Sequence, residues 1–399
     1  AVSANQMSLA LSPQDAEAHN NLGIIFKKLN RSDEALSAYA QALTLNPDLI
    51  EATANLGVAI TDIKFNSSNN ILYPMLINLL TAGNFVRPSE VVNGILSLLK
   101  HDPLIEELLA KRNIAENIVG ITSAIETLDK LPLLHHLMRI SPLSDLQLEG
   151  LFVAIRRILL KCLDEIQNSP ATVYFLSTLS LHCFTNEYVY FENDEESQQI
   201  DDLELKIRNN LAQRKQPALL DVLCFATYRP LHCHDWCEEL VVLDQFAEVK
   251  ERLIEQPFAE MTIKKDITVL GGISNEISLK VREQYEENPY PRWVKLSIPL
   301  KKRSIVEFCN EVDLKLHSEN IKEVSAPEIL VAGCGTGQHS IETATRFSDC
   351  QVTAVDLSLG SLAYAQRKTN ELGIENLNYL QADILDLHRL DREFDIIES

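Results

Sequence analysis

The sequence of 399 residues contains no uninterrupted apolar run near the roughly 20 residues that a membrane-spanning helix requires. Its most apolar helical stretch, residues 151–163, is broken by Arg156 and Arg157. No secretory signal peptide is visible, and the chain does not begin with Met. We therefore predict no membrane segment, and we expect the first residue to be a cut end.

The sequence also lacks a regular cysteine framework. Its eight cysteines are scattered, which suits a reducing compartment and predicts a cytoplasmic protein. The closest group, His232-Cys233-His234 with Cys237, has no second pair of ligands nearby and is typical of a turn that leads into a helix. We predict that these side chains pack and that the chain holds no metal, with a zinc site as the weaker alternative.

Basic residues are scarce relative to acidic ones. The chain has 36 Lys and Arg against 57 Asp and Glu, which gives a formal net charge of -21. So acidic a surface repels phosphate backbones and disfavours non-specific nucleic-acid binding. Hydrophobic residues make up 46% of the sequence, which is ample for a buried core, and the length predicts two or three domains.

Residues 16–49 resemble a tetratricopeptide repeat, a pair of antiparallel helices. Gly23 and Ala35 are small where the two backbones would approach, and Asp15 and Ser32 stand where helix N-caps belong. The other positions of the pattern are His19, Leu22, Phe26, Tyr39, Ala42, Leu43 and Pro47.

The repeat period of about 34 residues extends in both directions. One step back from Pro47 reaches Pro13, and one step forward from Gly23 reaches Gly57. We expect residues 1–65 to form tetratricopeptide repeats that are truncated at the start. Repeats of this kind present a surface suited to other proteins, so we predict a protein or peptide partner.

Residues 66–270 show short apolar segments at helical spacing, punctuated by prolines, which predicts an all-α region. Within it the aromatic residues 188–191 run directly into the acidic residues 192–196. We interpret these as a buried aromatic helix and a solvated loop, with a ligand or metal role for the acidic run as the weaker alternative. Nothing in this region indicates catalysis.

The character of the sequence changes near Ile273. A helical segment at 275–287 leads into an aromatic, proline-stiffened connector at 288–293, and strands and helices then alternate. The predicted strands are 328–331, 351–355, 377–380 and 394–397. Such alternation is typical of a parallel, doubly wound sheet. The predicted fold class is therefore multidomain: an all-α tetratricopeptide and helical N-terminal region, followed at 271–399 by an incomplete α/β Rossmann-like domain that is truncated at the end.

The first of these strands runs directly into Gly333, Gly335 and Gly337. Glycine lets the backbone turn sharply and lets a ligand touch the main chain, and the next helix points its free N–H groups at the loop. Asp356 ends the second strand, where a carboxylate can accept hydrogen bonds from two ribose hydroxyls. Asp383 follows the third strand, in position for an adenine edge. This ordered set predicts an adenosine-containing ligand.

The spacing of the glycines separates two ligand classes. In the dinucleotide fingerprint G-x-G-x-x-G the last glycine stands one position later, and that position is Gln338 here. The compact G-x-G-x-G loop instead suits a ligand without a pyrophosphate. In this respect residues 275–399 resemble the class I S-adenosylmethionine-dependent methyltransferases.

The resemblance implies S-adenosyl-L-methionine as the cofactor and methyl transfer to an unknown acceptor. The cofactor-binding residues that it implies lie in the glycine loop and just after the second and third strands: Gly333, Gly335, Gly337, Asp356, Leu357, Asp383 and Ile384. The glycines would border the methionine moiety. Asp356 would hold the ribose and Leu357 would lie against the adenine, while Asp383 and Ile384 would contact the adenine amino group and ring.

The whole chain resembles bacterial proteins that join tetratricopeptide repeats to such a methyltransferase domain, with similar stretches at residues 228–232 and 285–293. Tyr285 would by this resemblance close over the cofactor, although packing of the connector is the stronger interpretation. The last predicted strand is the fourth, and further strands usually carry the substrate-side residues. We therefore expect no catalytic base in this sequence, and no activity from this fragment alone. Two alternatives stay open: a tetratricopeptide scaffold with an idle Rossmann domain, and a nucleotide-dependent oxidoreductase.

Overall fold

The computed structural model describes residues 7, 9–83, 85–110, 118–287, 289–315, 321 and 323–399. Asn288, in the predicted connector, lies outside the described residues. The chain divides into two compact units, Ala1–Leu253 with Trp293–Leu296 and Ile254–Arg292 with Ser297–Ser399. None of the helices in the described ranges combines the length and the apolar character that crossing a bilayer demands.

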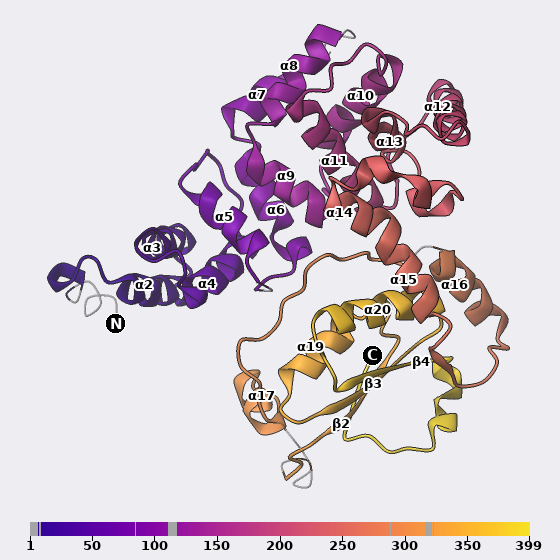
Figure 1. The fold of residues 1–399 in the computed structure, drawn as a ribbon. Coiled ribbons are helices and arrows are strands. Elements are labelled where there is room, and N and C mark those ends of the chain that lie inside the picture. The colour runs from indigo at the N-terminus through magenta and orange to yellow at the C-terminus, as the bar shows by residue number, and fades with distance from the viewer. Residues whose placement is uncertain are drawn as a thin grey trace. The chain divides into compact units, whose positions relative to one another are not determined.

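The first unit is helical (Figure 1). Its α-helices are α2 (Ala16–Lys28), α3 (Ser32–Leu45), α4 (Ile50–Thr61), α5 (Leu72–Thr81), α6 (Pro88–Leu99), α7 (Pro103–Ala110), α8 (Ile118–Leu128), α9 (Pro132–Ile140), α10 (Leu146–Lys161), α11 (Pro170–Thr185), α12 (Asp194–Ala212), α13 (Leu219–Phe225) and α14 (Ala247–Lys250). Short 3-10 turns η1 (Leu231–Cys233), η2 (Cys237–Glu239) and η3 (Val241–Leu243) lie between the last two, and a π-helical turn, η4 (Glu251–Glu255), follows α14.

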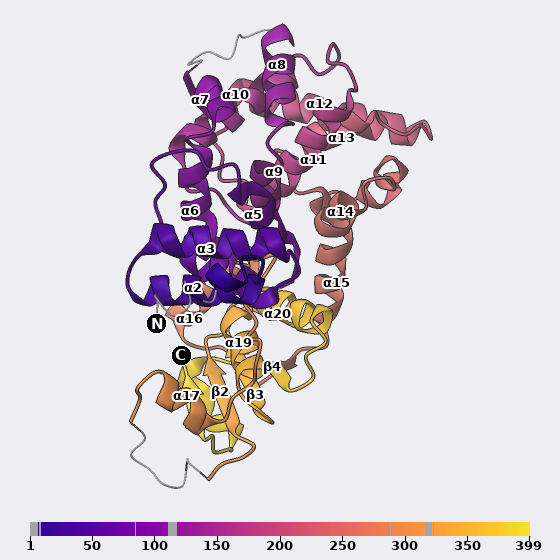
Figure 2. The same cartoon turned by 90° about the vertical axis from the view of Figure 1, so that its left-hand side faces the viewer.

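The repeat predicted at residues 16–49 is formed by α2 and α3, which lie side by side (Figure 2). Gly23 faces the Tyr39 ring so closely that a Cβ built on the glycine would lie 2.5 Å from Tyr39 Cε1. Tyr39 is 2% exposed, and Ala35 is fully buried. The two small residues therefore stand where the helices approach, as the spacing predicts.

Only one of the two predicted N-caps is confirmed. Asp15 caps α2, because its side chain accepts a hydrogen bond from Ala18 N at 3.0 Å. Ser32 is instead the first residue of α3, and Arg31 takes the cap position without a side-chain hydrogen bond. Arg31 forms an ion pair with Glu34 across the first turn, a contact that the capping pattern does not reveal.

The α4 backbone lies directly against the helices that follow the repeat. A Cβ on Gly57 would lie 2.3 Å from Val86 Cγ1, and a Cβ on Gly94 of α6 would lie 2.4 Å from the Ile60 carbonyl oxygen. Only glycine at 94 permits this approach, because a backbone oxygen cannot move aside like a flexible side chain. The repeat helices and the following helical region therefore share one core.

Residues 188–196 differ from the prediction. The aromatic part forms no helix, and the acidic part begins α12 instead of a solvated loop. Asn193 and Glu196 form a capping box at this start. Glu196 is fully buried and also accepts hydrogen bonds from Arg157 Nε at 3.1 Å and Tyr228 OH at 2.9 Å. The prediction was wrong because the sequence shows the charges but not the partners that satisfy one of them.

The second unit is an α/β structure. In chain order it contains α15 (Gln256–Ile263), β1 (Thr268–Val269), α16 (Glu276–Glu287), α17 (Ile305–Glu311), β2 (Glu328–Ala332), α19 (Gln338–Arg346), β3 (Gln351–Asp356), α20 (Leu359–Glu371), β4 (Leu377–Gln381), the 3-10 helix η5 (Ile384–Leu390) and β5 (Ile396–Glu398). The strands form a parallel sheet in the order β1-β4-β3-β2-β5. The predicted Rossmann-like architecture is confirmed.

The sequence does not predict strand β1, which the sheet contains in addition to the four predicted strands. Thr268 and Val269 pair with Leu380 and Gln381 of β4. This strand has only two residues, both exposed, so neither alternation nor an apolar run marks it. It also precedes residue 271, where the sequence predicts the start of the domain.

Each face of the sheet is covered. On one face the Tyr379 hydroxyl forms hydrogen bonds with Ser340 of α19 at 3.2 Å and with Thr369 of α20 at 2.9 Å. These two helices lie on that side of the strands in Figure 1. Side chains alternate along a strand, and the other face carries a buried cluster whose centre is Leu330, Val355 and Ala382. The candidate site lies between these layers, at the edge of the sheet that the carboxyl ends of the strands form.

We predict that Gly23→Ala destabilises the helical unit, whereas Gly150→Ala does not. A methyl group at Gly23 must displace the buried Tyr39 ring, at a cost of about 1–3 kcal/mol. Nothing lies within 4 Å of a Cβ built on Gly150 of α10, so alanine stabilises that helix by about 0.5–1 kcal/mol. Urea unfolding followed by circular dichroism measures both variants. Equal midpoints would contradict the close packing of α2 on α3.

Candidate functional site

The glycine loop joins β2 to α19 with a left-handed backbone. The φ angle is 79° at Gly333, 52° at Gly335 and 87° at Gly337, values that a residue with a Cβ adopts only with strain. The N–H groups of Gly333 and Cys334 both donate to the Val355 carbonyl oxygen, at 2.9 and 3.0 Å. The loop therefore lies over the end of β3.

The three glycines have different surroundings. A Cβ built on Gly333 or Gly335 meets no atom within 4 Å, so a ligand has room to approach the backbone there. A Cβ on Gly337 would instead lie 2.6 Å from Ala365 Cβ and 2.9 Å from the Tyr379 hydroxyl oxygen. Gly337 is thus required by packing against α20 and β4, a reason that the motif alone does not reveal.

Asp356 ends β3 beside this loop. Its Oδ2 accepts a hydrogen bond from Gly335 N at 2.8 Å, and its Oδ1 accepts one from Ser358 N at 2.9 Å. An ionised carboxylate offers about four acceptor positions, and the Leu357 N–H adds a third backbone interaction, so the backbone amides still leave acceptor capacity unused. Hydroxyl donors on a ligand match that remaining capacity.

The environment of Asp356 also changes its ionisation. Burial raises the pKa of this carboxyl above its ordinary value, and the nearby Glu286 carboxylate adds to the rise. The hydrogen bonds from Ser358 N and Gly335 N act in the opposite direction. A partly desolvated carboxylate gains strongly from further donors, because hydrogen bonds to an ionised group are roughly twice as strong as neutral ones.

The remaining predicted residues lie along the same edge. Asp383 follows β4, is 4% exposed and caps η5 by accepting a hydrogen bond from Leu385 N at 3.0 Å. Gln381 Nε2 donates to the carbonyl oxygen of Leu357 at 2.8 Å, which links the ends of β4 and β3. Leu357 is half-buried and Ile384 is 55% exposed. All seven predicted positions therefore lie at or just after the carboxyl ends of β2, β3 and β4.

The end of α16 reaches this edge as well. Ser358 Oγ donates to the Tyr285 carbonyl oxygen at 2.9 Å, and Gly360 N donates to Glu286 Oε2 at 3.2 Å. Although burial opposes ionisation, hydrogen bonds from Lys264 and Gly360 N lower the pKa of Glu286. The Tyr285 side chain is 39% exposed. The sequence places Tyr285 upstream of the site, and the structure shows its backbone bound to the residues that follow β3.

The connector after α16 is fastened to the glycine loop. Thr336 Oγ1 donates to the Pro291 carbonyl oxygen at 2.9 Å. Arg292 lies 3.4 Å from Glu260 of α15, and Glu260 in turn pairs with Arg367 of α20 at 2.8 Å. Glu260 and Arg367 are both buried. These contacts explain the proline-stiffened segment as a strap across the second unit, and no spacing in the sequence indicates its partners.

Glu398, at the end of β5, turns toward α19. It lies 2.8 Å from His339 Nε2 and 3.7 Å from Arg346 Nη1, and it accepts a hydrogen bond from Thr343 Oγ1. Three side chains of one helix thus hold this carboxylate beside the start of α19. It is a polar feature of the same sheet edge. From the sequence, a contact between the cofactor and Glu398 or Ser399, at the mouth of the fourth predicted strand, is a hypothesis, and it stays untested.

The histidine and cysteine group at 232–237 has ordinary contacts. His234 Nδ1 lies 3.1 Å from Glu204 Oε1, and its ring centroid lies 5.1 Å from that of Trp236. Cys233 is exposed and Cys237 is buried. Across the described ranges, no three His, Cys, Asp or Glu side chains gather in a way that could hold a metal ion. The absence of a metal stays a prediction.

Comparison with known protein families finds matches for two segments of the chain. The model of a methyltransferase domain matches residues 329–399, which contain the glycine loop, Asp356 and Asp383. The chain carries a methyltransferase domain. The model of a tetratricopeptide repeat matches residues 16–49, so this protein joins the two modules, as the resemblance predicts.

Individual relatives share parts of the chain. An uncharacterized protein of Synechococcus is 36% identical over 76 residues, 19% of this chain and 18% of its own length. A probable (S)-tetrahydroprotoberberine N-methyltransferase 2 of Papaver bracteatum is 25% identical over 134 residues, 32% of this chain and 37% of its own. A release factor glutamine methyltransferase of Rhodopirellula baltica is 25% identical over 168 residues, 41% of this chain and 53% of its own length. The chain therefore spans at most about half the length of these relatives.

We predict that alanine is far more costly at Gly337 than at Gly333 in the methyltransferase domain. Both substitutions force a Cβ into a left-handed backbone, at about 1–2 kcal/mol. Only Gly337→Ala also drives that Cβ into Ala365 and Tyr379, which adds about 1–3 kcal/mol of overpacking. Thermal unfolding without ligand compares the two variants. If their melting temperatures fall equally, the packing role of Gly337 is wrong.

Proposed function

We propose that the methyltransferase domain binds S-adenosyl-L-methionine and that the protein transfers its methyl group to an acceptor. The observation that carries this proposal is the position of the Asp356 carboxylate, held by Gly335 N and Ser358 N, with acceptor capacity left over beside an open glycine loop. The match to a methyltransferase domain over residues 329–399 supports the same chemistry.

The residues present fit an adenosine joined to an amino acid. The backbone beside Gly333 and Gly335 is open enough for the amino-acid end, which carries no bulky phosphates. Asp356 would accept from the two ribose hydroxyls. Leu357 and the exposed Ile384 would flank the adenine, and Asp383 would accept from its amino group. Gly337 would shape the loop through its contact with α20.

Methyl transfer depends mainly on the alignment of the cofactor's methyl group with the acceptor nucleophile. When bound, S-adenosyl-L-methionine supplies a methyl group on a positively charged sulfur, which is already activated for transfer. The protein contributes by holding the cofactor and the acceptor nucleophile in line. We assign no catalytic base to the described residues, and the acceptor stays open.

We further propose how the rest of the chain serves this activity. Residues 1–65 would bind a protein or peptide partner through the tetratricopeptide repeats, residues 66–270 would form a helical region, and residues 271–399 would form the methyltransferase domain, with α15 packed on its α20. The free state of all eight cysteines supports a reducing, cytoplasmic location.

Replacing Asp356 tests the cofactor site. Asp356→Asn removes the charge that strengthens two ligand hydrogen bonds, each worth about 1.5–3 kcal/mol. We expect S-adenosyl-L-methionine to bind at least about tenfold more weakly in calorimetry on the full chain. Asp349→Asn is the matched control, because Asp349 is exposed on a left-handed turn with φ 54° that asparagine tolerates.

Two results would contradict the assignment. Unchanged affinity of Asp356→Asn for S-adenosyl-L-methionine would show that this carboxylate does not bind the cofactor. Preferential binding of NAD by the unchanged protein would replace the cofactor class and favour an oxidoreductase. If neither ligand binds, the scaffold alternative gains support.

The raised pKa of Asp356 predicts a pH dependence. Lowering the pH through that pKa protonates the carboxyl and removes acceptor capacity, so affinity for S-adenosyl-L-methionine should fall at a higher pH than an ordinary aspartate would give. The ligand-free fold changes in the opposite sense, because a group with a raised folded pKa contributes stability below its unfolded pKa and loses it as the pH rises through the folded value. Calorimetry between pH 8 and pH 4.5 measures the profile. An equally steep profile in Asp356→Asn would assign the effect to another group.

A further inference from the structure

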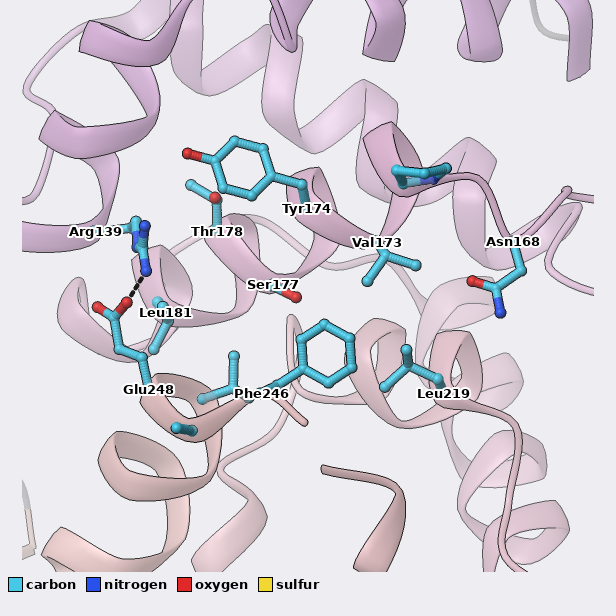
Figure 3. A pocket seen from close by; sticks show the side chains of 13 residues that line it. Arg139, Asn168, Val173, Tyr174, Ser177, Thr178, Leu181, Leu219, Phe246 and Glu248 are labelled. Carbon is cyan, nitrogen blue, oxygen red and sulfur yellow. Dashed lines mark ion pairs between the residues drawn. The ribbon is translucent and has the colours of Figure 1, made fainter. Parts of the chain in front are cut away.

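The helical unit contains a pocket of about 590 Å³ that the proposed methyl transfer does not use (Figure 3). It lies between α11, the start of α13 and the segment that begins α14, and the end of α9 contributes Arg139. Sites for small organic ligands commonly have volumes of about 300–1,000 Å³. The pocket is therefore of a size that fits one such molecule.

The wall of the pocket is mainly apolar. Val173 and Leu181 of α11 face Phe246 and Leu219 from the opposite side, and Figure 3 shows the Phe246 ring directed toward Val173. The rings of Phe246 and Tyr174 offer flat surfaces on which an aromatic ligand can stack or pack edge to face. This lining favours an aromatic hydrocarbon body over a sugar or a phosphate.

The charged groups of the pocket satisfy one another. Arg139 forms an ion pair with Glu248, drawn as a dashed line in Figure 3. Arg252 Nη1 also lies 3.2 Å from Glu248 Oε1, and it donates to the Arg139 carbonyl oxygen at 2.7 Å. A charged ligand would have to break this arrangement, so the occupant should be uncharged.

One polar atom of the lining is both buried and without a partner in the part of the chain that the structure describes. The Ser177 hydroxyl oxygen is buried and has no hydrogen-bond partner among the described residues. Its neighbour Thr178 has one, because Thr178 Oγ1 lies 3.1 Å from His135 Nδ1. A buried hydroxyl without a partner costs about 1–3 kcal/mol. In Figure 3 the Ser177 oxygen lies on the side of α11 that faces Phe246, where a ligand atom could supply the missing bond.

We propose that this pocket binds a small, uncharged aromatic molecule with one hydrogen-bonding group, which pairs with the Ser177 hydroxyl. The apolar wall holds the ring, the Arg139–Glu248 pair disfavours net charge, and Ser177 selects the polar substituent. All of its lining belongs to the helical unit, whereas the proposed cofactor-binding residues belong to the second unit.

A matched pair of probes tests the proposal on the full chain. Naphthalene and 1-naphthol differ only by a hydroxyl, and calorimetry should show saturable one-to-one binding of both. We expect 1-naphthol to bind about threefold to tenfold more tightly, the effect of one neutral hydrogen bond. Ser177→Ala should remove this preference and leave naphthalene binding nearly unchanged. A preference that survives in Ser177→Ala would overturn the role of the hydroxyl.

Filling the pocket tests its location. Val173→Trp should lower the affinity for both probes at least about tenfold. The matched control is Val189→Trp, because Val189 is 69% exposed and does not line the pocket. Should Val173→Trp fail to fold, Leu219→Trp fills the space from the opposite wall. Absence of saturable binding to the unchanged protein, or full affinity in a folded filled variant, would overturn the proposal.

Discussion

The Asp356 carboxylate is the constraint on which the candidate site depends. Two backbone N–H groups, from Gly335 and Ser358, donate to its two oxygens. One belongs to the loop after β2 and the other to the turn after β3, so a single side chain fixes two strand ends relative to each other. The same side chain has acceptor capacity left for a ligand. Structure and proposed function thus use one carboxylate, and the site is preorganised before any ligand arrives.

The contacts around Asp356 extend to segments that are distant in sequence. The Ser358 hydroxyl donates to the Tyr285 carbonyl oxygen at the end of α16, and the Thr336 hydroxyl donates to the Pro291 carbonyl oxygen in the connector. The upstream helix and connector are therefore held against the same edge of the sheet. Because a hydroxyl pairs with a backbone oxygen in each contact, these connections depend on geometry rather than on a recognisable side-chain motif.

Buried polar groups define the helical unit in a comparable way. Glu196 is fully buried yet satisfied by Arg157, Tyr228 and its own capping box. Removing Arg157, the one cation among these partners, would leave the buried carboxylate without an opposite charge, which costs about 3–5 kcal/mol for a buried ion pair. Ser177 is the contrasting case, since its buried hydroxyl is unsatisfied at the wall of an apolar pocket. This difference is what separates a structural polar group from a candidate binding group.

The sequence by itself determined the features that rest on local spacing. The small residues Gly23 and Ala35 mark the repeat, and the glycine triplet followed by Asp356 marks the Rossmann-like edge, because each pattern is imposed by backbone geometry within one or two elements. Tertiary structure alone decided the rest. The two-residue strand β1 exists only through its pairing with β4, and Glu196 is buried only because Arg157 and Tyr228 reach it. Partners that are far apart in sequence leave no periodic signal, so folding is required to bring them together.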